Sequence, residues 1–144
     1  IVSQNIDSPT NPVRFTMRAI HHENLILPLQ KASSLGLGIR SYSKVDPSAK
    51  GDIPYDEELF VYPNTGGLST SCPPKANIPQ HFLNGSRSLF GIDTFILEEM
   101  RLKFRQDPNK SNHFFIEPIQ KMLLKEYEQS ISNTLHHWKL YSGE

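Results

Sequence analysis

Two stretches in the first half of the chain have the apolar and polar spacing of β-strands. Residues 13–20 alternate closely enough to period two to predict a strand with Arg18 on its polar face. Residues 59–62 predict a second strand, which Pro63 ends because proline has no N–H to donate to a sheet. Between the two, residues 25–34 predict a short helix that a proline interrupts.

The second half of the chain pairs an aromatic strand with a helical stripe. Residues 113–117 have the aromatic and β-branched content of a strand, and Pro118 both ends it and suits the first turn of a following helix. The apolar residues of that helix recur at three- and four-residue steps, so they form one stripe that should cover a sheet. They are Ile119, Leu123, Tyr127, Ile131, Leu135 and Trp138. Residues 93–105 fit either an amphipathic helix or a charged strand.

Length, charge and cysteine content narrow the class of protein. The 144 residues predict one domain, residues 1–144, in which residues 1–12 are expected to be irregular. The 15 Lys and Arg residues balance the 15 Asp and Glu residues, which disfavours a basic nucleic-acid reader. No apolar run approaches the roughly 20 residues that span a bilayer, so no membrane partner is expected. Cys72 is the only cysteine, which excludes an internal disulfide and favours a reducing, intracellular compartment.

A basic stretch from Arg14 to Lys44 leaves a second interpretation of the N-terminal region open. The stretch holds several lysines and arginines against a single acid, Glu23. Residues 40–43 look like the end of a mitochondrial presequence. On that interpretation the protein is mitochondrial, and part of its N-terminal region is a sorting signal.

The densest cluster of hydroxyl groups is found in residues 62–71, directly after a predicted strand. Gly66 and Gly67 allow a ligand to approach the backbone closely, and the neighbouring serines and threonines offer hydrogen bonds. The same composition is typical of an ordinary hairpin turn, so both interpretations stay open. A phosphate loop of the Walker type is excluded because no Lys-Ser or Lys-Thr follows the glycines.

Four further residues each allow a structural and a chemical role. His113 makes a structural hydrogen bond at a strand end or contacts a substrate. Cys72 is expected to be a small buried residue rather than a nucleophile, since no base can be named for it. Glu117 is either solvated at a helix N-terminus or projects its carboxylate at a sheet end. Arg18 is paired with an acid or presented to an anionic ligand, because burying a lone guanidinium costs too much. The two adjacent histidine pairs lack zinc-ligand spacing, so no metal is expected.

Four segments follow one another in a recognisable order along the chain. They are Arg18-Ala19 in the first strand, residues 62–69 (Tyr-Pro-Asn-Thr-Gly-Gly-Leu-Ser), Ile78-Pro79, and residues 113–118 (His-Phe-Phe-Ile-Glu-Pro) with Met122 after them. Together they resemble the compact cytotoxic effectors of type VI secretion whose fold is like NAD-dependent ADP-ribosyltransferases, a group with fungal relatives. The resemblance covers most of the chain.

The resemblance implies an α+β fold: a small ADP-ribosyltransferase-like domain with two packed, mainly antiparallel sheets, flanking helices and a C-terminal amphipathic helix. It also implies that Glu117, Ser69 and Thr65 are catalytic. A carboxylate beside the nicotinamide ribose stabilises the positive charge that develops when the bond to nicotinamide breaks. The NAD-binding residues that it implies are Arg18, Tyr62, Gly66, Gly67, Thr70, Ser71 and His113.

The activity that the resemblance implies is that of an NAD-dependent ADP-ribosyltransferase-like toxin. Such an enzyme cleaves the nicotinamide–ribose bond and transfers ADP-ribose to a protein or nucleic-acid acceptor in the cytoplasm of a target cell. NAD is the co-substrate, and no metal is required. A protective immunity-type protein that occludes the site is the expected partner. The alternative is a non-catalytic binding module that keeps the same fold.

Overall fold

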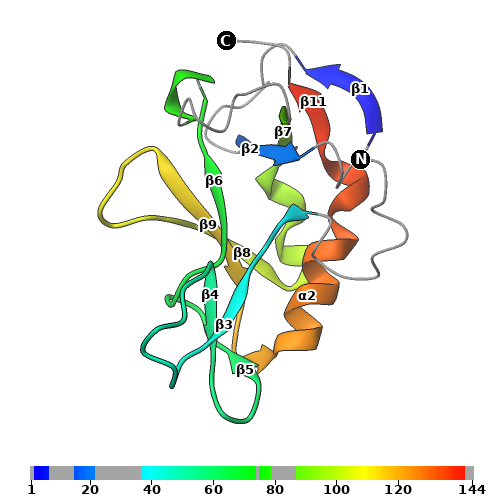
Figure 1. Ribbon diagram of the computed structural model, residues 1–144. Coiled ribbons are helices and arrows are strands. Elements are labelled where there is room, and N and C mark those ends of the chain that lie inside the picture. Colours follow the sequence, from blue (N-terminus) through cyan, green and yellow to red (C-terminus); the bar gives the residue numbers. More distant parts are fainter. Residues whose placement is uncertain (1, 7–14, 22–36, 74, 79–86, 142–144) are drawn as a thin grey trace.

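Seven strands form one mixed sheet in the computed structural model of the chain (Figure 1). The structure describes residues 2–6, 15–21, 37–73, 75–78 and 87–141. In spatial order the strands are β1 (Val2–Ile6), β11 (Lys139–Tyr141), β7 (Arg87–Asp93), β2 (Phe15–His21), β6 (Leu68–Ser71), β9 (His113–Pro118) and β8 (Leu102–Gln106). Every neighbouring pair is antiparallel except β1 and β11, which run parallel.

The sheet consists of two halves that meet at one residue pair. Strands β2 and β7 pair along seven residues, and β6 and β9 along four, but β2 and β6 pair only at Met17 and Ser71. We call β1, β11, β7 and β2 the packed half, and β6, β9 and β8 the β9 half. In Figure 1 the packed half lies at the top and the β9 half extends below it. The two halves therefore diverge beyond the Met17–Ser71 pair.

One helix covers the same face of both halves. Helix α2 (Leu124–Asn133) begins where Leu123 donates its N–H to the Glu126 carboxylate, at 3.0 Å, and a 3₁₀ turn, η7 (Leu135–His137), follows it. Its apolar side packs into one core with residues from both halves, among them Ile20 and Ile116. The other core residues on this face include Phe90, Ile92, Leu68, Leu102, Tyr127, Ile131 and Trp138. Burial of this shared core is what holds the diverging halves together.

Short elements complete the described fold. Strands β5 (Phe60–Val61) and β10 (Met122–Leu123) form an antiparallel ribbon, and β3 (Ser41–Ser43) pairs in parallel with β4 (Ile53–Tyr55). Three further 3₁₀ turns are η3 (Lys75–Asn77), η5 (Thr94–Ile96) and η6 (Glu98–Met100). No helix in the described ranges is both long enough and apolar enough to cross a membrane.

The mixed α+β class with mainly antiparallel pairing is confirmed. The strands expected at residues 13–20, 59–62 and 113–117 correspond to β2, β5 and β9, although residues 13 and 14 lie outside the described ranges. Instead of two separate large sheets, the described strands form one sheet of two halves and two short ribbons. The helix expected at residues 25–34 lies outside the described ranges.

Several expectations on local structure were wrong or held only in part. The C-terminal helix begins at Leu124 rather than after Pro118, because Pro118 belongs to β9 and residues 122–123 pair with β5. Its first two stripe residues, Ile119 and Leu123, are therefore exposed, at 39% and 42%. Of residues 93–105, the first ends β7 and the next form the 3₁₀ turns, while the charged-strand alternative holds for β8. Residues 68–71 form a strand instead of continuing the turn, and residues 2–6, expected to be irregular, form β1.

Candidate functional site

The β9 half carries polar side chains on the face opposite helix α2. Opposed residues of antiparallel strands project to the same side, and the register places Ser69 opposite Phe115, Ser71 opposite His113, and Lys103 opposite Glu117. We call this set of side chains the polar face, formed by Ser69, Ser71, Lys103, Arg105, His113, Phe115 and Glu117. Ser71 and Glu117 are buried within it. Of the predicted site residues, it brings together Ser69, Ser71, His113 and Glu117.

Glu117 is the most deeply buried charged residue of the polar face. Its side chain is 0% exposed, and its Oε2 accepts hydrogen bonds from Arg105 Nε at 2.9 Å and from the backbone N–H of Asn64 at 2.8 Å. The other oxygen, Oε1, is buried and has no hydrogen-bond partner in the part of the chain that the structure describes. Glu117 is thus neither solvated nor at a helix N-terminus. One of its oxygens is fixed, and the other keeps its full accepting capacity.

The turn at residues 62–67 places its backbone directly against Glu117. Gly66 and Gly67 have φ of 147° and 152°, and Asn64 has φ of 65°, so the turn uses backbone conformations that L-residues with side chains rarely adopt. A Cβ on Gly66 would lie 2.3 Å from the Asp52 carbonyl oxygen, and one on Gly67 would lie 2.6 Å from the Ile116 carbonyl oxygen. The two glycines therefore allow two neighbouring segments of this chain to approach. Their predicted contact with NAD stays a prediction.

Phe115 lies between a cation and an imidazole on the polar face. Arg105 Cζ is 4.8 Å from the centroid of the Phe115 ring, and the His113 ring meets Phe115 edge-on, also at 4.8 Å. His113 Nδ1 is 2.8 Å from Asp107 Oδ2. A continuous row thus runs from Asp107 to Glu117 across the face. The structural hydrogen bond expected for His113 is confirmed.

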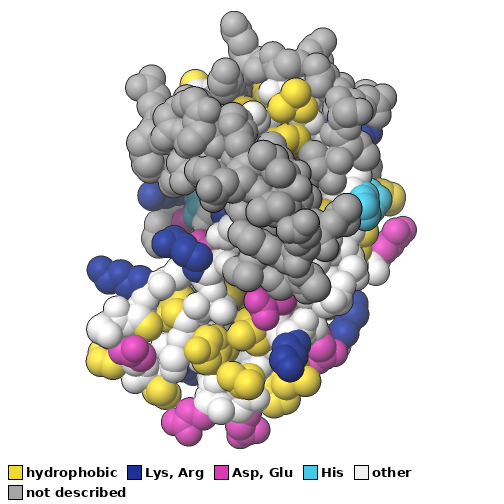
Figure 2. Space-filling model, turned by 45° about the vertical axis from the view of Figure 1, so that its right-hand side comes forward, with side chains coloured by type: hydrophobic (Ala, Val, Ile, Leu, Met, Phe, Trp, Pro, Cys, Tyr) yellow, Lys and Arg dark blue, Asp and Glu magenta, His cyan; other side chains and the backbone are white. Residues whose placement is uncertain are grey.

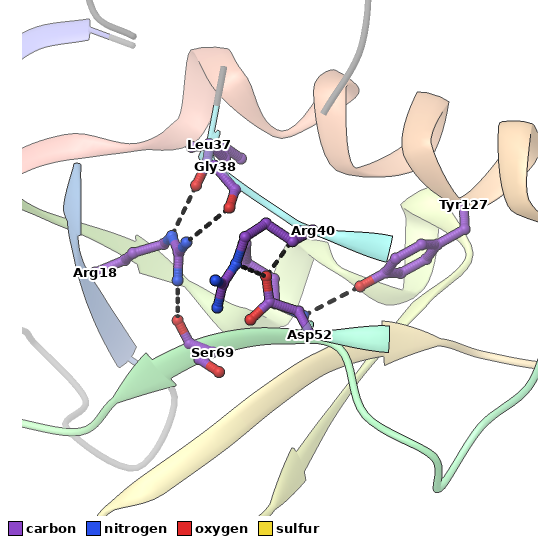
Figure 3. Close-up of polar contacts among 8 residues, drawn as sticks. Arg18, Leu37, Gly38, Arg40, Asp52, Ser69 and Tyr127 are labelled. Atoms are coloured by element: carbon purple, nitrogen blue, oxygen red, sulfur yellow. Dashed lines mark hydrogen bonds and ion pairs between the residues drawn. The ribbon is translucent and has the colours of Figure 1, made fainter. Parts of the chain in front are cut away.

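Arg18 lies on the opposite face of the sheet, where the two halves diverge (Figure 3). Its guanidinium donates to three carbonyl oxygens, those of Leu37 at 2.8 Å, Ser69 at 2.7 Å and Gly38 at 3.5 Å. Charge-assisted bonds of this kind are among the strongest in proteins. Arg18 is therefore close to Ser69, as expected. It binds the main-chain carbonyl of Ser69, however, whereas the Ser69 side chain lies on the polar face.

Tyr127 fastens the helix to the β9 half from the core side (Figure 3). Its hydroxyl donates to the Ile116 carbonyl at 2.6 Å and accepts the Leu68 N–H at 3.2 Å, so it bridges two residues that oppose each other across β6 and β9. Burial raises the pKa of this phenol well above its ordinary value, because the ionised form would lose its water. The hydroxyl group therefore stays neutral and acts as a structural bridge.

Three further predicted site residues make their hydrogen bonds to groups outside the polar face. Tyr62 donates its hydroxyl to the Asp56 carboxylate, and this bond raises the pKa of Tyr62. Thr65 bonds within its own turn, to the Tyr62 carbonyl at 2.7 Å. Thr70 faces the core side, with its hydroxyl 3.5 Å from the Phe114 carbonyl. Their predicted roles toward NAD stay predictions.

Cys72 follows β6 and lies beside Asn77. Cys72 is partly exposed rather than buried, and Asn77 Nδ2 donates to its carbonyl at 3.0 Å and approaches its sulfur at 3.6 Å. No cluster of three or more His, Cys, Asp or Glu residues with metal-binding geometry occurs among the described residues. Figure 2 shows basic and acidic side chains side by side on the visible face, in keeping with the balanced sequence.

Arg105, Asp107 and Phe115 were not selected from the sequence. Lys103 and Arg105 alternate with Leu102 and Phe104, which is the period of a strand with one charged face. The sequence alone does not separate this spacing from that of an amphipathic helix. Nothing local shows that Arg105 reaches Glu117, because that contact depends on the register of two strands.

The comparisons with known proteins found no relative. No protein-family model, no curated protein and no solved structure matches this chain. The fold and the polar face are therefore interpreted from their own geometry.

Proposed function

We propose that this chain is an NAD-dependent ADP-ribosyltransferase-like enzyme and that the polar face is its active site. The observation that carries the proposal is the Glu117 carboxylate, which has one oxygen held by two donors and the other buried without a partner among the described residues. A buried acceptor that lacks a partner is costly, and such groups concentrate where a ligand is bound or a charge develops. Glu117 therefore supplies a fixed negative charge for an electron-poor sugar.

The negative charge of Glu117 suits cleavage of the nicotinamide–ribose bond. When the bond between ribose C1 and the nicotinamide nitrogen breaks, the electron pair leaves with nicotinamide and positive charge develops on the ribose. The carboxylate of Glu117 stabilises this charge, and its fixed position avoids reorganisation during the reaction. The attacking atom of the acceptor then bonds to C1 and gives up its proton. NAD is the co-substrate, and ADP-ribose passes to a protein or nucleic-acid acceptor.

The other side chains of the polar face fit the remaining parts of NAD. Ser69 and Ser71 supply hydroxyl groups for the ribose, and Lys103 and Arg105 supply cations for the pyrophosphate. Arg18 instead fixes the position of Ser69 through its main-chain bond. In this proposal it supports the site and does not receive the pyrophosphate itself.

The biological setting is part of the same proposal. The chain acts as a toxin in the cytoplasm of a target cell, and a protective immunity-type protein covers the polar face in the producing cell. Co-expression of such a protein should restore growth to cells that are killed by the wild-type chain. Cells that express Glu117→Gln should grow without it.

A direct assay tests the enzymatic step. The purified chain is incubated with NAD and cell lysate, and released nicotinamide is measured together with mass additions on proteins and nucleic acids. Glu117→Gln should abolish release while the circular dichroism spectrum stays that of the wild type. Glu99→Gln, which changes an exposed acid in η6, is the matched control and should keep wild-type release. No nicotinamide release from the wild-type protein would contradict the proposal.

A second candidate is a non-catalytic binding module on the same fold. It is favoured by Arg18, whose guanidinium donates to main-chain carbonyls, and by the ion pair that joins Glu117 to Arg105. Both features also suit a purely structural role. If the chain is a binding module, adding NAD or a protein ligand should shift the NMR signals of the polar-face residues, and no nicotinamide should be released.

A further inference from the structure

Asp107 is fixed by the turn that joins β8 to β9. Its Oδ1 accepts the N–H of Asn109 at 2.8 Å, and its own N–H donates to the His113 carbonyl at 2.8 Å. The hydrogen bond from Asn109 and then that from His113 lower the pKa of Asp107 below its ordinary value, so it is a carboxylate at neutral pH. The turn thus presents a negative oxygen at a fixed place beside β9.

The Asp107 carboxylate determines which nitrogen of His113 carries the proton. A carboxylate only accepts hydrogen bonds, so His113 Nδ1, at 2.8 Å from Asp107 Oδ2, is the donor. In the neutral imidazole the lone pair is then on Nε2. This nitrogen has no hydrogen-bond partner among the described residues, and the side chain is 25% exposed. His113 has the orientation of a general base with its accepting nitrogen available.

His113 and Glu117 project from the same face of one strand. They are four residues apart on β9, so their Cα atoms lie about 13 Å from each other. Phe115 is between them, and the His113 ring leans onto it, edge-on. His113 and the Glu117 carboxylate therefore lie on the same face of β9, on either side of Phe115.

We propose that His113, oriented by Asp107, is the general base that removes the proton from the acceptor, and that the acceptor is a hydroxyl oxygen. This inference rests on the proposed function. In the step, the acceptor O–H proton moves to His113 Nε2, the oxygen bonds to ribose C1, and the C1–nitrogen electron pair leaves with nicotinamide. Water and alcohols are the simplest members of this acceptor class, whereas an already ionised acceptor would need no base.

Among the described residues, the charged groups near the imidazole lie on two elements. Asp107 and Lys110 belong to the turn before β9, Arg105 reaches across Phe115 from β8, and β6 presents the uncharged Ser71. A protonated imidazole cannot accept a second proton. The transfer rate should therefore fall as the pH is lowered. With His113→Gln this dependence should disappear.

The test uses NAD with methanol as a hydroxyl acceptor, and measures nicotinamide, ADP-ribose and methyl ADP-ribose between pH 5 and 8. His113→Gln should slow methanol and water transfer by about 100-fold or more, and Asp107→Asn should slow it less. His136→Gln, an exposed histidine in η7, is the matched control and should behave as the wild type. Nitrogen-15 NMR of the side chain should show the proton of neutral His113 on Nδ1, and Asp107→Asn should remove that preference.

The outcomes separate this inference from the function on which it rests. If the wild type releases nicotinamide, and His113→Gln keeps both the wild-type rate and the wild-type pH dependence, the general base is wrong and the proposed function stands. A proton on Nε2 of neutral His113 would also overturn it. If the wild type releases no nicotinamide, both proposals fall.

Discussion

The two halves of the sheet differ in how they use the face turned away from helix α2. In the packed half this face is apolar: Phe15, Met17, Leu89 and Tyr141 form a second buried cluster with Ile78. In the β9 half the corresponding face holds serines, a histidine and an ion pair. Both halves share the apolar core on the α2 side. The packed half is therefore built for stability on both faces, and the β9 half on only one.

The difference shows where the chain retains polar groups that packing does not require. Burying Glu117 and Arg105 brings little net stability, because desolvation offsets much of their attraction. The packed half uses apolar side chains on the corresponding face. The polar side chains of the β9 half are therefore the ones that we propose to serve binding and catalysis. The following predictions test that contrast.

The largest effect is expected from breaking the ion pair of the β9 half. Arg105→Met leaves the buried Glu117 without its cation and should reduce the free energy of unfolding by about 3–5 kcal/mol. Adding Glu117→Leu removes the unpaired charge, so the double variant should recover most of that loss, as measured by urea unfolding. Its nicotinamide release should stay at zero. A double variant as unstable as Arg105→Met alone would show that the pair is needed for folding.

A smaller loss is expected from shortening Met17 in the packed half. Met17 is 0% exposed, so Met17→Ala should cost about 2–5 kcal/mol through lost burial and the cavity left behind. Ser69→Ala, on the polar face of the adjoining strand, should change stability by less than about 0.5 kcal/mol. Thermal and urea unfolding of both variants measure this contrast. Equal losses would remove the distinction between the halves.

The dependence of the β9 half on the helix can be measured at Tyr127. Tyr127→Phe removes the hydroxyl that joins Leu68 and Ile116, leaving two buried main-chain groups without their bridge. The expected cost is about 1–3 kcal/mol in unfolding free energy. Hydrogen exchange should increase in β6 and β9 more than in β2 and β7. Uniform acceleration across the sheet would contradict a local role.

Lowering the pH should reduce the stability of the β9 half, because Asp107 becomes protonated. The pKa of this carboxyl is lower in the folded chain than its ordinary value of 3.8, so its contribution is complete above about pH 4. That contribution is lost as the pH falls through the folded-state pKa. The carboxyl has a higher pKa in the unfolded chain, so protonation favours unfolding. Urea midpoints between pH 2 and 7 should decline less steeply at the acid end in Asp107→Asn than in the wild type. Parallel curves would exclude this contribution.

The smallest effect is expected in the helix that both halves share. The Ser132 hydroxyl is buried without a partner in the described part of the chain, so Ser132→Ala should be neutral or stabilise by up to about 1 kcal/mol. Thr134→Val is the contrasting variant, since the Thr134 hydroxyl donates to Ile131 and accepts from Trp138. It should lower the melting temperature, and Ser132→Ala should not.

The sequence predicts strands well where their composition or alternation is distinctive. Strand β2 is predicted by its alternation, and β9 by its aromatic and β-branched residues before Pro118. The start of the helix was misplaced because Ile119 and Leu123 fit the helical spacing by coincidence, while pairing of Met122 and Leu123 with β5 keeps the chain extended. Pairing partners distant in sequence are not visible in a local pattern.

The candidate site was predictable only in part, for the same reason. Ser69, Ser71, His113 and Glu117 could be selected because each is a polar residue in or beside a recognisable strand. Their shared face depends on the register of β6 and β9, and the ion pair with Arg105 depends on β8. The bonds from Arg18 to three main-chain carbonyls also escape sequence reasoning, because every residue has a carbonyl and only the fold selects which ones are near.

The polar face is tested most directly by an NMR titration of the folded wild-type chain with NAD. The account predicts that amide signals shift in residues 69–71, 103–105 and 113–117, while those of β2 and β7 stay in place. It also predicts that free nicotinamide accumulates in the same sample. Shifts confined to the packed half, or no shift at millimolar NAD, would contradict the assignment of the polar face as the functional surface.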